Sequence, residues 1–280
     1  MNVSSPGPDP VLYDTHMHTP LCKHADGEPE DYAAVAQARG LKGIIVTCHN
    51  PVPDWAPNIR MELDEFDDYV ALVARAREAW AGRLDVLLGL ESDYVPGMEE
   101  WLEVLHTRAP LNYVLGSVHP QLKPYKARFY NGDNREYALT YFKHLAMAAE
   151  TGLFDCLSHP DLVKNIVAHD WEPMNILDDV RPFLDRIAAT GIAMEINTSG
   201  LHKVIREMNP GPIFLKEMCE RQIPVVIGSD AHVPERVGAN FEQALDNLEA
   251  AGYRSTLVFT ERRAREIPIS LSRETLCPFQ

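Results

Sequence analysis

The chain lacks a long apolar run, and it has fewer basic than acidic residues. A helix that spans a bilayer needs about 18 to 20 consecutive apolar residues, and no segment of the sequence provides them. The 26 lysine and arginine residues stand against 41 aspartate and glutamate residues, which gives a net charge of −15. Domains that bind nucleic acid are typically basic. These absences argue against a membrane protein and against a general nucleic-acid-binding surface.

Cysteine is also scarce, with five residues and no C-x-x-C spacing. An odd number without a pattern does not predict a disulfide framework, so the cytoplasm is the expected compartment. Residues 1–10 are rich in proline, serine and glycine and lack the apolar core of a secretory signal, so we expect a flexible leader. Residues 11–280 are expected to form one domain, because a single α/β barrel has about 250 residues.

Short apolar segments alternate with segments of helical periodicity. The strand-like segments are 11–14, 43–47, 84–90, 113–118, 154–158, 192–197 and 224–229, and a last apolar run covers 256–259. Helical patterns cover 29–40, 63–81, 136–151, 177–190, 213–221 and 241–251. Strands that alternate with helices pair in parallel through crossovers. Residues 54–60 and the helix-poor residues 121–135 are predicted to be active-site loops.

Metal-ligating side chains stand where these apolar runs end. They are His16, His18, His49, Glu91, His119, His159, Asp230 and His232, and His24 follows the first run closely. Imidazole and carboxylate groups are ligands of Zn, Fe and Mn. Strand ends that meet at one end of a barrel are where barrel enzymes carry their chemistry.

The spacing of these residues favours a shared site over isolated structural histidines. His16 and His18 are two residues apart, as are Asp230 and His232, so each pair points to one face of an extended chain. Glu91 closes a very apolar run, and a buried carboxylate needs a cation or hydrogen bonds to offset its desolvation. A hydrogen-bonded structural role explains any one histidine, but it must be invoked separately for six histidines at strand ends. The sequence therefore predicts a metal-dependent hydrolase.

The ordered set of motifs resembles the polymerase and histidinol phosphatase (PHP) superfamily over about residues 11–270. The motifs are His16-Met17-His18, His24, Thr47-Cys48-His49, Glu91, Gly116-Ser117-Val118-His119, His159-Pro160-Asp161-Leu162, Asn197-Thr198-Ser199-Gly200-Leu201 and Gly228-Ser229-Asp230-Ala231-His232. Several of them resemble those of PHP-type histidinol-phosphate phosphatases. This resemblance implies a distorted (β/α)7 TIM-like barrel with a trinuclear metal site at the C-terminal ends of its strands.

The resemblance also implies which residues hold each metal. His16, His18, Glu91 and Asp230 would hold one cation; Glu91, His119 and His159 a second; and His24, His49 and His232 a third. All nine positions carry suitable residues. The metal can be Zn, Fe or Mn, since all three suit such ligands, and neither its identity nor the oligomeric state follows from the sequence.

Three positions depart from the family pattern. Cys48 stands where an aspartate is usual, His202 where an arginine is frequent, and Asn165 where a basic residue is common. By strand alternation Cys48 points away from His49, so we expect it to act on a neighbouring ligand and not as a ligand itself. His and Asn do not reproduce the bidentate phosphate contact of arginine, so these departures bear on the substrate.

The function implied is hydrolysis of a phosphate monoester by a metal-activated hydroxide, with a small phosphorylated molecule as the substrate. Lys164, His202 and Lys203 are the predicted phosphate contacts, and Asp26 and His49 are candidates for donating a proton to the leaving group. Histidinol phosphate is the expected substrate, and an acidic pocket wall with Glu195 and Asp161 would suit its amine. Two alternatives remain: a PHP-family phosphoesterase that acts on a nucleotide or sugar phosphate, and a non-enzymatic binding module.

Overall fold

Seven parallel strands form one sheet in which each strand pairs with the next strand along the sequence. The computed structural model describes residues 9–52, 56 and 58–277, so most of the predicted leader lies outside the described residues, and the domain limits of 11–280 stay a prediction. The strands are β1 Tyr13–Asp14, β2 Gly43–Val46, β3 Asp85–Asp93, β4 Tyr113–Ser117, β5 Cys156–Leu157, β6 Ala193–Asn197 and β7 Val225–Gly228.

Backbone hydrogen bonds between the first and last of these strands bring the sheet round into a barrel. The N–H of Thr15 donates to the carbonyl of Ile227 over 3.4 Å, and the N–H of His18 donates to the carbonyl of Ala231 over 2.9 Å. Met17 and Ala231 also form a parallel bridge just beyond the ends of β1 and β7. The predicted seven-stranded α/β barrel is therefore confirmed.

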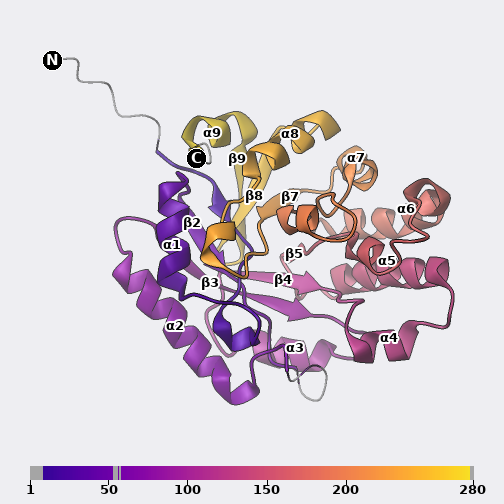
Figure 1. The fold of residues 1–280 in the computed structure, drawn as a ribbon, viewed down its shortest axis with the longest axis horizontal. Coiled ribbons are helices and arrows are strands. Elements are labelled where there is room, and N and C mark those ends of the chain that lie inside the picture. The colour runs from indigo at the N-terminus through magenta and orange to yellow at the C-terminus, as the bar shows by residue number, and fades with distance from the viewer. Residues whose placement is uncertain (1–8, 53–55, 57, 278–280) are drawn as a thin grey trace.

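Helices lie between successive strands and surround the barrel (Figure 1). Their bounds are α1 Pro29–Ala38, α2 Phe66–Ala79, α3 Glu99–His106, α4 Lys123–Phe129, α5 Asn134–Glu150, α6 Pro173–Thr190, α7 Pro212–Glu220, α8 Phe241–Ala251 and α9 Ile269–Thr275. Local signals set several of these ends. The N–H of Glu28 bonds the Asp31 carboxylate over 2.9 Å at the start of α1, and Gly191, with φ 74°, ends α6 as a left-handed cap.

One predicted loop contains a helix. Residues 121–135 were expected to be helix-poor, but α4 occupies the middle of this segment. The helix has only seven residues, too few to be stable by propensity alone. Tertiary packing supports it: Tyr125 is buried and its hydroxyl contacts His144 Nδ1 over 2.7 Å. A periodicity argument from the sequence cannot detect such a helix.

Alternation along the strands separates two apolar layers. In β4, Tyr113 and Leu115 belong to a small inner cluster, while Val114 belongs to the large layer under the helices. The inner cluster also contains Val258 and Phe259 of β8 (Ser255–Thr260). The strand β8 pairs antiparallel with β9 (Arg263–Pro268), so the last apolar run adds a hairpin and not a barrel strand.

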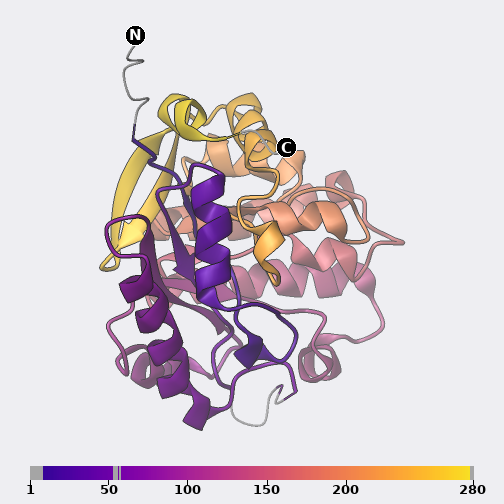
Figure 2. The same cartoon turned by 60° about the vertical axis from the view of Figure 1, so that its left-hand side comes forward.

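This hairpin, yellow in Figure 2, closes the end of the barrel at which the strands begin. The Arg262 guanidinium in its turn lies 2.5 Å from Asp155, just before β5. The apolar inner cluster thus fills the N-terminal end, and the polar strand ends are left at the other. No helix among the described residues is long and apolar enough to cross a membrane.

Gly228 in β7 packs tightly against Glu195 and His16, and a substitution at Gly228 tests this packing. A Cβ at Gly228 would lie 2.0 Å from Glu195 Oε1 and 2.6 Å from the Cβ of His16. We expect Gly228→Ala to lower the free energy of unfolding by about 1–3 kcal/mol, measured by urea denaturation. Gly152→Asn is the control, because Gly152 has φ 70° and nothing within 4 Å of an added Cβ. Equal stability of the two variants would contradict this packing.

Candidate metal centre

The strand ends turn their polar side chains toward one another. In β4 the alternation that points Tyr113 and Leu115 into the barrel continues through Ser117 to His119. In β3 the same alternation leads from Leu87, which packs on the inner cluster, to Glu91. Parallel strands end at the same side of a barrel, so side chains distant in sequence meet there.

Three groups of side chains lie in positions from which each could hold a metal ion. They are His16, His18 and Asp230; Glu91, His119 and His159; and His24, His49 and His232. Within each group the ligand atoms lie within 4.8 Å of one another. We call these nine residues the rim cluster. The structure brings together every residue predicted to bind metal, but Glu91 is grouped with His119 and His159 or with His18 and His49, and not with His16, His18 and Asp230 as the resemblance implies for the first cation.

Glu91 lies at the centre of the rim cluster. Its Oε2 is 2.6 Å from His49 Nδ1 and 3.5 Å from His16 Nε2. Its Oε1 is 3.1 Å from His159 Nε2 and 3.3 Å from His119 Nε2. Burial raises the pKa of Glu91, but the neighbouring imidazoles outweigh this effect and hold the pKa well below its ordinary value. One ionised carboxylate therefore faces all three groups.

The cluster leaves buried polar atoms without hydrogen bonds. Among the described residues, His16 Nε2 and His18 Nδ1 have no hydrogen-bond partner, and His49 Nδ1 and Glu91 Oε2 lie 2.6 Å apart without the geometry of a hydrogen bond. Buried polar atoms are nearly always satisfied in native proteins. Imidazole nitrogens and carboxylate oxygens are good ligands for divalent cations. The residues present thus fit the metal ions that the sequence predicts.

The protonation of His16 depends on the carboxylates around it. Burial lowers the pKa of His16, but the charges of Glu195, Glu91 and Asp230 outweigh burial and raise the pKa well above its ordinary value. Burial and the nearby His232 instead lower the pKa of His18 well below its ordinary value. Protons therefore compete with a cation more strongly at His16 than at His18.

A buried carboxylate behind His16 fixes the orientation of its ring. Glu195 Oε1 lies 2.8 Å from His16 Nδ1, and Glu195 Oε2 accepts the backbone N–H of His159 over 2.9 Å. A partner on one ring nitrogen aims the other nitrogen at the metal. Glu195 is 0% exposed, so it holds ligands in place and does not form the acidic substrate wall predicted from sequence.

Asp93 and Arg60 support His119 in a similar way. The Asp93 carboxylate contacts His119 Nδ1, and Arg60 forms an ion pair with the same carboxylate over 2.6 Å. The sequence analysis did not single out Asp93, although it stands two residues after Glu91 on the same face of β3. Arg60 is the last residue of the loop predicted at residues 54–60, of which 54, 55 and 57 lie outside the described residues. Only the fold brings its side chain to His119.

The three residues predicted to contact phosphate lie in different surroundings. Lys203 Nζ lies 3.5 Å from Asp230 Oδ2, at the edge of the rim cluster. Lys164 is fully buried, with Nζ 3.1 Å from Asp161 Oδ2 and 2.7 Å from the carbonyl of Met208. Lys164 and Asp161 therefore form a buried ion pair with each other. His202 is exposed and lines a cavity of about 500 Å³ beside Arg236.

The remaining sequence candidates lie close to the cluster. Asp26 is exposed, and its backbone N–H donates to the carbonyl of His232 over 2.9 Å. Cys48 belongs to the outer apolar layer, and its sulfur accepts the Thr19 hydroxyl over 3.2 Å. Cys48 thus faces away from His49, as alternation predicts, and it is absent from the groups of described residues that could hold a metal.

Comparisons with known proteins agree with this site. The PHP domain family model matches residues 14–199. The chain belongs to the PHP domain family. It is 39% identical over 264 residues to a protein of Deinococcus radiodurans named probable histidinol-phosphatase, which covers 90% of this chain and 98% of the relative. It is 26% identical to the histidinol-phosphatase of Bacillus subtilis, with 83% of this PHP chain and 98% of the relative covered.

A solved structure shares the fold of this PHP protein. Histidinol phosphate phosphatase from Lactococcus lactis, solved with zinc, L-histidinol and phosphate, superposes with a TM-score of 0.77 at 17% identity. The match covers 91% of this chain and 98% of the other. The likeness covers the whole seven-stranded barrel and shows that the two proteins share a fold.

Glu195→Gln tests whether the carboxylate orients His16 as a ligand. The amide keeps the size of the side chain but loses the charge, so we expect about 10- to 100-fold weaker binding of one cation, measured by competition with a chelating indicator. Glu217→Gln is the matched control, because Glu217 is also buried but pairs with Arg181 and Arg221. Unchanged affinity for every cation in Glu195→Gln would contradict the orienting role.

Proposed function

We propose that this chain is a metal-dependent histidinol-phosphate phosphatase of histidine biosynthesis. The observation that carries the proposal is the convergence of the nine residues of the rim cluster around the buried Glu91 carboxylate. The family membership and the 39% identity to a probable histidinol-phosphatase support the reaction class and the substrate. A binding module without activity would have no need of so complete a set of ligands.

The rim cluster would hold divalent cations, with Zn, Fe and Mn all suited to its ligands. Such cations supply an activated hydroxide at neutral pH and neutralise charge that develops on the phosphoryl oxygens. The protein's own contribution is to hold the ligands rigidly: Glu195 fixes His16, and Asp93 fixes His119. The buried surroundings strengthen each of these interactions, because the local dielectric constant is low.

Residues at the edge of the cluster are placed to act on the substrate. Lys203 carries a positive charge next to Asp230 and is our candidate for binding a phosphate oxygen. Asp26, beside His232, is our candidate for donating a proton to the leaving alkoxide, and its exposed carboxylate could also pair with the amine of histidinol. His49 is the second candidate donor. It contacts Glu91, so its role as a ligand competes with proton transfer.

The five cysteines are all free, and three of them are buried. Unpaired thiols are the usual state in a reducing compartment. We therefore propose that the enzyme works in the cytoplasm on a small phosphorylated substrate, without nucleic acid as a partner.

The substrate is tested by release of inorganic phosphate from a panel of monoesters. We expect L-histidinol phosphate to have the highest kcat/KM, and Glu91→Gln to lower it at least about 100-fold because the central carboxylate loses its charge. Glu217→Gln should keep wild-type activity. A higher kcat/KM for a nucleotide or sugar phosphate would replace the substrate but leave the reaction class intact. No hydrolysis of any monoester in metal-loaded protein would refute both.

The pH dependence of activity is a second test. Protons compete with cations for the imidazoles, and the raised pKa of His16 in the cation-free protein makes this competition strongest there. Lowering the pH therefore protonates His16, releases the cation and reduces activity, whereas raising the pH restores both. We expect activity and bound metal, measured by elemental analysis after desalting, to fall together on the acid side. Activity that persists in protein stripped of metal by acid would contradict this mechanism.

A further inference from the structure

Cys22 brings a thiol to one end of the rim cluster. Cys22 ends a short 3-10 helix, Pro20–Cys22, and is completely buried. Its sulfur lies with ligand atoms of His18 and His232 in a group whose members are all within 4.8 Å of one another. It is one of five such sets among the described residues, and it shares His232 with the set that contains His24 and His49. A metal ion bound by His232 therefore has a sulfur atom within reach.

The chain turns sharply after Cys22, and the turn aims two side chains at the same place. Lys23 has a left-handed backbone with φ 68°, and its N–H donates to the carbonyl of Pro20 over 2.9 Å. The next residue, His24, directs Nδ1 to the carbonyl of Cys22 over 2.6 Å, which leaves Nε2 free for a ligand. The ring of His24 lies 4.7 Å from that of His232, measured between ring centroids.

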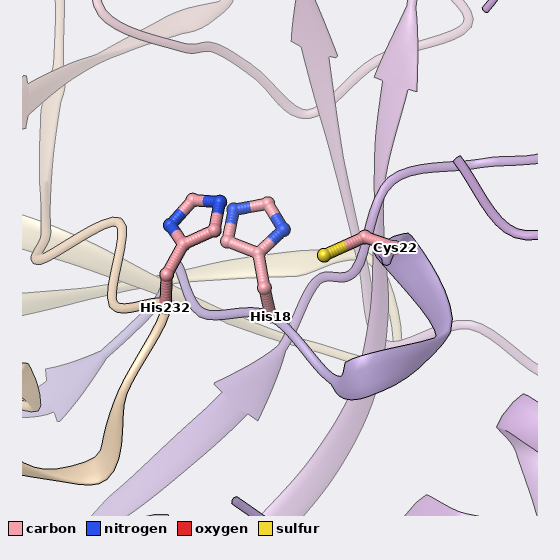
Figure 3. Close-up of side chains that lie close together, drawn as sticks. All are labelled: His18, Cys22 and His232. Carbon is pink, nitrogen blue, oxygen red and sulfur yellow. The ribbon is translucent and has the colours of Figure 1, made fainter. Parts of the chain in front are cut away.

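A second observation points to the same space. His18 is 1% exposed, and its Nδ1 has no hydrogen-bond partner among the described residues. Figure 3 shows the Cys22 sulfur pointing toward the His18 ring, with one ring nitrogen on the side of the sulfur and His232 on the other side. The sulfur and the unpartnered Nδ1 therefore face the same space, as two ligands of one cation do, while Nε2 of the same ring lies 3.2 Å from Asp230 Oδ1.

We propose that the Cys22 thiolate is a ligand of a cation held together with His18 and His232, and that this sulfur makes that position selective for Zn²⁺ over Mn²⁺. Thiolates prefer Zn²⁺, whereas Mn²⁺ prefers oxygen ligands. The thiol proton leaves as the sulfur coordinates, since a coordinated thiol is deprotonated. The inference rests on the metal dependence proposed above, but it does not depend on which phosphate ester is the substrate.

The neighbouring Cys48 does not take this role. Its sulfur receives the backbone N–H of Thr19 over 3.4 Å and the Thr19 hydroxyl over 3.2 Å, and it lies in the outer apolar layer. It also forms a hydrogen bond with the Cys22 thiol. Cys22 therefore faces the metal-ligating side chains, whereas Cys48 faces the outer apolar layer. This difference supplies the matched control.

Cobalt substitution tests the proposal. Co²⁺ gives an intense near-ultraviolet charge-transfer band with a thiolate ligand and none with imidazole or carboxylate. Full-length protein is stripped of metal, loaded with Co²⁺ under a phosphine reductant, and analysed for cobalt content and absorption. We expect the band in wild type, in Cys48→Ser and in the surface variant Cys219→Ser, and its loss in Cys22→Ser with the other cobalt transitions retained.

Metal preference gives a second readout. In competition between Zn²⁺ and Mn²⁺, Cys22→Ser should lower the Zn²⁺ preference of one site at least about tenfold, whereas Cys219→Ser should not. If Cys22→Ser does not fold, X-ray absorption of the zinc-loaded wild-type protein tests the proposal instead. A sulfur ligand requires a zinc–sulfur distance of about 2.3 Å, and its absence would overturn the proposal.

The outcomes separate this inference from the proposed function. Cobalt- or zinc-loaded wild type that hydrolyses the ester but shows no sulfur ligand overturns the role of Cys22 and leaves the function standing. A band that disappears in Cys48→Ser and persists in Cys22→Ser overturns it as well. Protein that binds no cation and has no activity overturns both.

Discussion

The arrangement of this protein depends on one unfavourable feature, a buried carboxylate surrounded by imidazoles. Glu91 is 1% exposed and lies within 4 Å of five histidines. An isolated buried charge is costly, and here the surrounding imidazoles stabilise it. Divalent cations would stabilise it further, at the atoms of the cluster that make no hydrogen bond. Because the buried Glu91 carboxylate needs compensating positive charge, the arrangement of the cluster indicates a metal-dependent function.

The barrel serves this cluster by keeping its two ends chemically different. The β8–β9 hairpin and the inner apolar cluster fill the end at which the strands begin. At the other end the same alternation turns Glu91, His119 and Asp230 toward one another. Carboxylates behind the ligands, such as Glu195 and Asp93, then fix the rings of His16 and His119. The acidic protein surface does not matter to an anionic substrate in such a site, because the charge of bound cations dominates the local field.

One end of the rim cluster carries a thiol in addition to imidazole and carboxylate groups. Cys22 lies with His18 and His232, whereas the Cys48 sulfur contacts Thr19 in the outer apolar layer. Thiolates favour Zn²⁺ and Mn²⁺ favours oxygen ligands, so the proposed sulfur ligand would set the metal preference at that end of the cluster.

The sequence by itself determined the barrel, its single-domain size and the nine candidate ligands, because strand alternation and the positions of strand ends are local properties that the order of residues fixes. Only the tertiary structure decided which residues support those ligands. Arg60 reaches His119 from a distant loop, Lys164 is buried against Asp161 and not at the substrate, and helix α4 exists because Tyr125 packs on His144. These outcomes depend on contacts between segments far apart in the chain, and no periodicity records them. Cys22 belongs to the same class: its letter is visible in the sequence, but its position beside His18 and His232 follows only from the turn at Lys23 and the closure of β1 on β7.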